Sequence, residues 1–145
     1  MQKQLIEELN KQLANWNVLN TKLHNYHWNV TGSDFFTLHT KFEEFYNEAA
    51  TTIDEIAERI LTIGGKPVAS LSEYLKGTTL SEATGTETAR EMVAAIAKDF
   101  EQIVAESNEL IEVAEKANDE STADMFIQVK TTLEQHIWML KAFLG

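Results

Sequence analysis

The stretch FFTLHTKFEEFYNEAATTIDEIAERILTI, residues 35–63, decides the fold of this chain. Its apolar residues recur at steps of three and four, which is typical of one face of an amphipathic helix. Beside that face lie side chains of the kinds that bind metals. His39 and Glu43 are four residues apart, and further along Asp54 and Glu58 are also four residues apart. Each pair is therefore expected to project from one face of the helix.

The two pairs lie too far apart to surround one metal ion within one chain. At about 1.5 Å per residue, His39 and Asp54 are about 22 Å apart along the helix axis, whereas a metal–ligand bond is about 2 Å long. At about 100° per residue, all four side chains fall on one flank of the apolar stripe. Two antiparallel copies of this helix, related by a twofold axis, would bring the two pairs together twice. The spacing predicts two identical sites, each shared between two chains.

Helical periodicity also continues through residues 5–30, 92–114 and 125–144. Residues 64–85 form a long connection between two pairs of helices. The expected N-caps are Ser33 or Asp34 for the second long helix, Ser70 for a short helix over 71–76, Thr88 with Glu91 for the third long helix, and Asn118 or Asp119 for the fourth. This order predicts an all-α fold, a ferritin-like four-helix bundle with one long crossover carrying a short helix, as a single domain over residues 1–145.

Composition narrows the classes of function. The absence of Cys excludes disulfides and thiolate metal sites. The chain has no apolar run of about 18 residues that could cross a membrane, and its start does not resemble a signal peptide, so a cytoplasmic location is expected. The net charge of −11, with no cluster of Lys or Arg, argues against binding to nucleic-acid phosphates. An acidic body favours cations, although it could serve solubility alone.

A further histidine joins the predicted site. His27 lies just before the turn between the first two helices and His39 just after it, so the two imidazoles should lie at similar heights. Each shared site would have two histidines and up to three carboxylates, a donor set that suits non-haem iron, manganese or zinc. Taken alone, such a histidine is more often structural, and Asp54 and Glu58 could instead pair with Arg59 or nearby Lys. No histidine has Glu three residues before it, so the Glu-x-x-His motif of intrachain di-iron bundles is absent.

Several segments resemble the Dps family, the DNA-binding proteins from starved cells or mini-ferritins. They are NYHWNVTG at 25–32, FFTLHTKFE at 35–43, DEIAERI at 54–60, GGKP at 64–67 and HIWMLKAF at 136–143. The resemblance implies a hollow homododecamer with a ferroxidase site at each twofold interface. Its iron ligands would be His27, His39 and Glu43 from one subunit, with Asp54 and Glu58 from the partner. Fe(II) would be oxidised by hydrogen peroxide, or by oxygen, and ferric oxide would be stored inside, which would protect against oxidative stress.

The resemblance also gives expectations for residues outside the ligand set. Trp28 would lie beside the site and either scavenge radicals or pack at the subunit interface. Asp119, Glu120 and Asp124 would line an iron-entry pore, although acids in a first helical turn also offset the helix dipole. His136 and Trp138 are interpreted as structural, and His24 has no assigned role.

Two departures from the family pattern stand out. Many members have Asp where this chain has Glu43, so ligation directly or through water stays open. The Lys-rich tail used by many members to bind DNA has no counterpart among these residues. We therefore expect no direct DNA binding, and a nucleoid-compacting DNA binder remains the alternative function.

Overall fold

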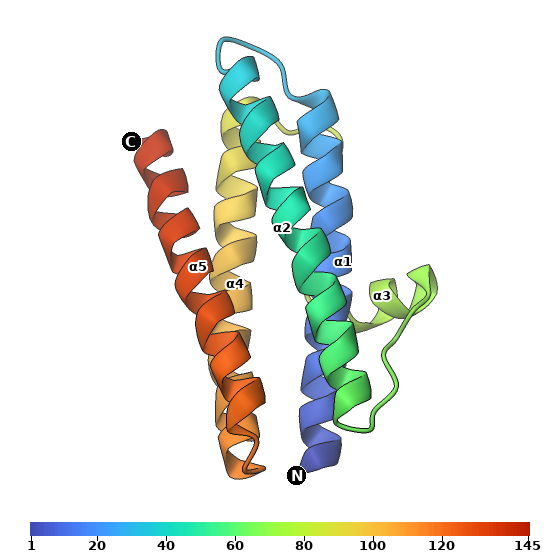
Figure 1. The fold of residues 1–145 in the computed structure, drawn as a ribbon. Helices are drawn as coiled ribbons and strands as arrows, with labels where there is room; N and C mark the ends of the chain where they lie inside the picture. Colours follow the sequence, from blue (N-terminus) through green and yellow to red (C-terminus); the bar gives the residue numbers. More distant parts are fainter. The chain divides into compact units, whose positions relative to one another are not determined.

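The protein is built from helices. The structure, a computed structural model, describes all residues 1–145 and contains five helices and no strand (Figure 1). In chain order these are α1 (Gln2–Asn29), α2 (Phe35–Thr62), α3 (Leu71–Gly77), α4 (Ala89–Lys116) and α5 (Glu120–Leu144). The four long helices and the short helix in the crossover are confirmed. None of the helices is both long enough and apolar enough to span a membrane.

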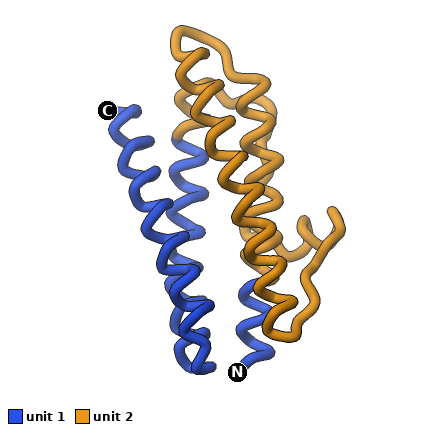
Figure 2. The backbone as a smooth tube through the Cα atoms, viewed as in Figure 1, with its two compact units in different colours: residues 1–9, 94–145 blue, residues 10–93 orange.

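Contacts within the chain define two compact units (Figure 2). One unit, Asn10–Val93, contains most of α1, all of α2 and α3, and the first residues of α4. The other consists of Met1–Leu9 and Ala94–Gly145, and in it α5 returns antiparallel to α4. All five predicted metal ligands lie in the unit Asn10–Val93, whose geometry therefore decides the site. The single domain expected over residues 1–145 stays a prediction.

The predicted apolar faces of α1 and α2 are largely buried. The eight residues of the first predicted stripe, seven in α1 and one directly after it, are all buried: Leu5, Leu9, Leu13, Trp16, Leu19, Leu23, Tyr26 and Val30. In α2 the buried residues are Leu38, Phe42, Phe45, Ala49, Ile56 and Ile60. Phe35, Ile53 and Ile63, also placed in that stripe, are half-buried. Burial of one continuous stripe fixes the rotation of each helix about its axis, and so fixes the direction of the flanking polar side chains.

Local hydrogen bonds explain where the helices begin and end. Thr88 and Glu91 form the predicted capping box at α4: each backbone N–H donates to the other's side chain, at 2.9 and 3.2 Å. Gly64 ends α2 with φ +91°, a conformation that suits glycine. Asp34 occupies the N-cap position of α2 but makes no capping bond with its side chain. Its backbone carbonyl accepts the first helical hydrogen bond, from the Leu38 N–H at 2.9 Å, but the expected cap by the Asp34 side chain was wrong.

Asn118 and Asp119, in the turn between α4 and α5, have different roles. Asn118 takes φ +58° and its N–H donates to the Glu115 carbonyl at 3.0 Å, which closes α4. Asp119 is the N-cap of α5, where its carboxylate accepts from the Thr122 N–H at 3.0 Å and the Thr122 hydroxyl at 2.6 Å. Of the two candidates, Asp119 therefore opens the helix and Asn118 closes the preceding one.

The crossover is tied to α1 by polar side chains in chain order. Asn10 accepts from the Val68 N–H and donates to the Lys66 carbonyl, at 2.9 and 3.1 Å. Asn15, which is fully buried, accepts from the Thr78 hydroxyl at 2.6 Å and the Thr79 N–H at 2.8 Å. Further along α1, Lys22 donates to the Ser81 carbonyl at 2.8 Å and Tyr26 donates to Glu87 at 2.6 Å. The crossover thus runs beside α1 in the direction of the helix.

Candidate metal centre

His27 and His39 face each other across the turn between α1 and α2. Their imidazole rings are stacked, with centroids 3.7 Å apart and planes inclined by 13°. His27 is buried and His39 is half-buried. The predicted meeting of the two imidazoles at similar heights is confirmed.

The two histidines hold each other through reciprocal hydrogen bonds to the backbone. Nδ1 of His27 lies 2.6 Å from the carbonyl oxygen of His39, and Nδ1 of His39 lies 2.7 Å from the carbonyl oxygen of His27. A carbonyl oxygen only accepts, so each Nδ1 carries the hydrogen. In a neutral imidazole the other nitrogen, Nε2, then has a free lone pair. Both rings are therefore held in the tautomer that can bind a metal, with a backbone partner of the kind that orients metal-binding histidines.

Glu43 lies next to this histidine pair. Its Oε1 is 3.8 Å from Nε2 of His27, and its side chain is 51% exposed. The Tyr46 hydroxyl, one helical turn further along α2, is 3.5 Å from the same oxygen. Burial, and then the negative charge of Glu43, raise the pKa of the Tyr46 phenol above its ordinary value. The phenol thus stays protonated and acts as a donor to the carboxylate.

An aromatic cluster that the sequence did not predict lies behind Glu43. The rings of His24 and Tyr46 stack with centroids 3.8 Å apart, and Tyr46 meets the His27 ring edge-on at 5.2 Å. Nδ1 of His24 donates to the Asn20 carbonyl at 2.8 Å. Sequence spacing offered a signal for this cluster, because His24 precedes His27 by three residues and Tyr46 follows Glu43 by three. The contact between α1 and α2 that joins them required the tertiary structure.

Asp54 and Glu58 have a different environment. Both lie on α2, both are exposed, and neither carboxylate has an ion-pair or hydrogen-bond partner within the chain. Pairing with Arg59, the alternative considered from the sequence, is thus not observed for either carboxylate. Within one chain, no group of three or more His, Asp or Glu side chains is placed to hold a metal ion. A complete site would need donors from elsewhere, and two bare carboxylates are available on the same helix.

The remaining predicted residues lie outside this histidine pair. Trp28 is 69% exposed, and its ring is tilted against His24 with centroids 5.4 Å apart. Asp119 has a structural role as the N-cap of α5, and this role does not require a pore. Glu120 and Asp124 are exposed, and Asp124 accepts from Gln128 at 3.2 Å. The pore lining and the part played by Trp28 stay predictions.

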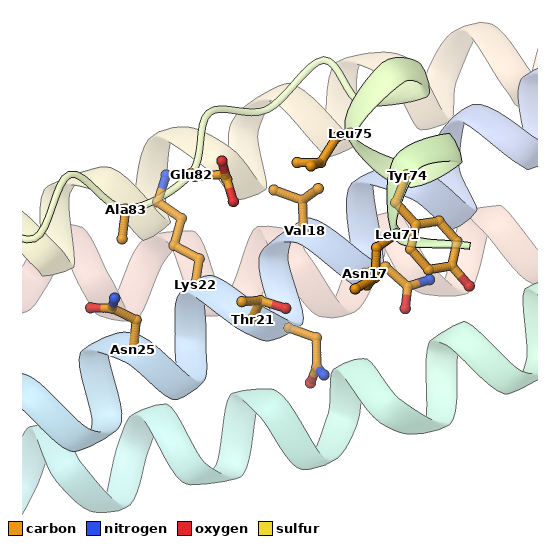
Figure 3. A pocket seen from close by; sticks show the side chains of 11 residues that line it. Asn17, Val18, Thr21, Lys22, Asn25, Leu71, Tyr74, Leu75, Glu82 and Ala83 are labelled. Carbon is orange, nitrogen blue, oxygen red and sulfur yellow. The ribbon is translucent and has the colours of Figure 1, made fainter. Parts of the chain in front are cut away.

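A cavity of about 370 Å³ lies between α1 and the crossover (Figure 3). Its polar lining consists mainly of neutral side chains, with one cation, Lys22, and one carboxylate, Glu82. The Lys22 ammonium donates a hydrogen bond to the Ser81 carbonyl and so helps to hold the crossover against α1. No histidine lines the cavity, so it lacks the imidazole donors that the His27–His39 pair offers to a transition metal.

Comparisons with known proteins give the family of this chain. A family model described as "Ferritin-like domain" matches residues 6–145. The chain is 58% identical to "DNA protection during starvation protein 2" of Bacillus anthracis, over 100% of this chain and 99% of that protein. It is 51% identical to "General stress protein 20U" of Bacillus subtilis (strain 168), over 100% of both proteins.

Solved structures of Dps proteins share the fold across the whole chain. The crystal structure of a Dps protein from Bacillus brevis matches with a TM-score of 0.99 and 51% identity, covering 99% of this chain and 97% of that one. A Dps protein from Vibrio cholerae O1, described as a member of a broad superfamily of ferritin-like diiron-carboxylate proteins, matches with a TM-score of 0.95 and 36% identity, covering 99% and 90%. The predicted all-α, ferritin-like fold class is confirmed. Because family, relatives and structures agree over nearly every residue, the chain belongs to the Dps family of ferritin-like proteins.

Proposed function

We propose that this protein oxidises Fe(II) at sites shared between two subunits and stores the ferric product inside a dodecameric shell. The observation that carries the proposal is the reciprocal bonding of His27 and His39, which leaves both Nε2 atoms free to bind a metal. Asp54 and Glu58 supply the second support, because they are exposed and unpartnered within their own chain. The histidine pair would need further carboxylates to complete a metal site, and the pair of carboxylates would need histidine nitrogens.

The donor set fits iron as a substrate. Imidazole nitrogen and carboxylate oxygen, without sulfur, suit non-haem iron. In the proposed site His27, His39 and Glu43 come from one subunit, and Asp54 and Glu58 of the partner subunit complete the ligand set. The carboxylates offset the positive charge of two ferrous ions and of the more highly charged ferric ions that follow.

Hydrogen peroxide is the proposed oxidant, with oxygen as the other candidate. Each of two Fe(II) ions gives one electron to one peroxide molecule, and the O–O bond breaks to give two hydroxide ions. These ions and two water molecules supply the oxygen of the product, so two Fe(II), one H2O2 and two H2O give two FeOOH and four protons. Iron and peroxide are consumed together, so less of either remains to generate hydroxyl radicals. The names of the relatives, DNA protection during starvation and general stress protein, fit a protective role of this kind.

Replacing the Asp54 and Glu58 carboxylates by amides of the same shape tests the proposal. The double variant Asp54→Asn with Glu58→Gln should lose rapid peroxide-driven Fe(II) oxidation by at least about 100-fold, because metal sites weaken 10–100-fold even when only an outer partner is lost. Helix content and particle mass should stay unchanged. A control that removes two other exposed acids of α2, Glu48→Gln with Glu55→Gln, should oxidise Fe(II) at the rate of the unmodified protein.

Mixing subunits tests whether the site is shared. Subunits with Asp54→Asn and Glu58→Gln, co-expressed with subunits carrying His39→Gln, should regain activity although each variant alone is inactive. Random pairing leaves one intact site in each mixed pair, or about a quarter of all sites, because a twofold axis makes both sites of a pair equivalent. Activity that stays absent in the mixture, or that persists in the carboxylate variant, would contradict a site shared between chains.

A further inference from the structure

Tyr46 lies where it can act on Glu43, the carboxylate donor next to the His27–His39 pair. Its hydroxyl is 3.5 Å from Oε1 of Glu43, and the same oxygen is 3.8 Å from Nε2 of His27. Glu43 is thus placed between a phenol that donates and a histidine nitrogen that can bind a metal. Ligating carboxylates usually accept such a hydrogen bond from a neighbouring residue.

Glu43 needs this help more than the two histidines beside it. The histidine rings are stacked on each other and bonded to the backbone, whereas the Glu43 side chain is 51% exposed. A glutamate has several rotatable bonds, and holding it in one conformation costs side-chain entropy. The structure gives Glu43 one hydrogen-bond donor, the Tyr46 hydroxyl.

Tyr46 is itself held in place from the other helix. Its ring stacks on His24 of α1, with centroids 3.8 Å apart and planes inclined by 19°. The His24 ring is fixed in turn by the bond from its Nδ1 to the Asn20 carbonyl. His24, which is not among the proposed ligands, thereby orients the phenol toward Glu43.

We propose that Tyr46 is a positioning residue that holds the Glu43 carboxylate for metal binding, supported by the stacked His24 ring. The phenol uses one acceptor position of the carboxylate, and the remaining lone pairs of its two oxygens stay available to the metal. The hydroxyl and the carboxylate oxygen are 3.5 Å apart, and hydrogen bonds at such sites commonly shorten when the site is filled. This role rests on the proposed iron site. It explains how Glu43 would be held in position to bind the metal there.

Binding of Co(II) to the assembled protein without oxidant tests this role, because Co(II) reports on the donor set through its visible absorption and requires no oxidation. Tyr46→Phe keeps the ring and its stacking on His24 but removes the hydroxyl. We expect Co(II) to bind about 3–10-fold more weakly, the effect of one hydrogen bond. With Fe(II) and peroxide, the half-saturating Fe(II) concentration should rise while the maximal rate changes little.

A double-mutant cycle identifies the partner of the hydroxyl. In a Glu43→Ala background, Tyr46→Phe should have no further effect on Co(II) binding, because the two residues act as one unit. Tyr74→Phe, which removes a half-buried hydroxyl in α3, should bind Co(II) like the unmodified protein.

Three results would overturn the role of Tyr46. Unchanged Co(II) binding in Tyr46→Phe would show that the hydroxyl does not matter, and an effect that persists in the Glu43→Ala background would show that it does not act through Glu43. If the unmodified protein binds no Co(II) at a site that needs His27, the iron-site proposal fails and the role of Tyr46 fails with it. The first two results leave the iron site intact, so the two proposals fail in distinguishable ways.

Discussion

The two halves of the proposed iron site differ in how far their own chain prepares them. His27 and His39 are stacked, bonded to each other's backbone and largely withdrawn from solvent. Asp54 and Glu58, on the same α2 helix as His39, are exposed and without partners. A neutral imidazole can be buried with one hydrogen bond, whereas a buried unpaired carboxylate is costly. The difference fits the proposal that one half is assembled during folding of one chain and that a second chain completes the site.

Breaking the histidine half should have the largest effect, because it disturbs both stability and function. His27→Ala removes a ligand, its hydrogen bond to the His39 carbonyl and its stacking on the His39 ring, so metal-free protein should lose about 1–3 kcal/mol of unfolding free energy. Fe(II) oxidation should fall at least about 100-fold, as in loss of a metal ligand or its support. Denaturant unfolding at fixed protein concentration and a peroxide-driven oxidation assay measure the two effects.

The carboxylate half provides the matched comparison for that measurement. Asp54→Asn with Glu58→Gln should change the unfolding free energy of metal-free protein by less than about 0.5 kcal/mol, since surface changes without partners usually do. Equal destabilisation by both sets of substitutions would show that the carboxylates have structural partners after all.

A third carboxylate, Glu87, sharpens the comparison because its own chain satisfies it completely. It accepts from the Tyr26 hydroxyl at 2.6 Å, from the Thr84 N–H and hydroxyl at 3.0 and 2.8 Å, and from the Gly85 N–H at 3.0 Å. Burial alone would raise its pKa, but the hydrogen bonds from Tyr26 and Thr84 outweigh burial and lower the pKa from 4.5 to about 2. Glu87 is thus a structural carboxylate that ties the end of the crossover to α1.

The lowered pKa of Glu87 predicts a stability difference that depends on pH. Its folded pKa lies below the unfolded value, so its contribution is complete above pH 4.5 and is lost as the pH falls toward about 2. Glu87→Gln should lower the unfolding free energy by about 1–2 kcal/mol at pH 7, and its difference from the unmodified protein should shrink between pH 4.5 and 2. Co(II) binding at pH 7 should stay unchanged. A stability difference that is constant across that pH range would contradict the assignment.

DNA binding is expected to show the smallest effect, because neither half of the site nor the rest of the chain gathers cations. The net charge is −11 and only 12 residues are Lys or Arg. In a gel-shift assay at about 150 mM salt, where phosphate contacts must displace counterions, the assembled protein should not retard duplex DNA. Tight retardation that weakens as salt is raised would restore the alternative function of a DNA binder.

Much of this comparison follows from spacing in the sequence. The four-residue intervals in α2 placed His39, Glu43, Asp54 and Glu58 on one flank, and the short turn after α1 placed His27 opposite His39. Helix periodicity is a local property, so capping boxes such as Thr88 with Glu91 were also predictable. The missing side-chain cap at Asp34 was not predictable, because whether an N-cap carboxylate reaches a free backbone N–H depends on how the preceding turn is folded.

The sequence by itself determined the helices, the apolar faces and the separation of the two ligand groups, because each depends on residues a few positions apart along one helix. Only the tertiary structure decided the hydrogen positions on His27 and His39, the contact of Tyr46 with Glu43, and the stacking of His24 behind it. These features join residues of α1 to residues of α2 or depend on that contact, and their geometry is set by how the two buried stripes rotate the helices against each other.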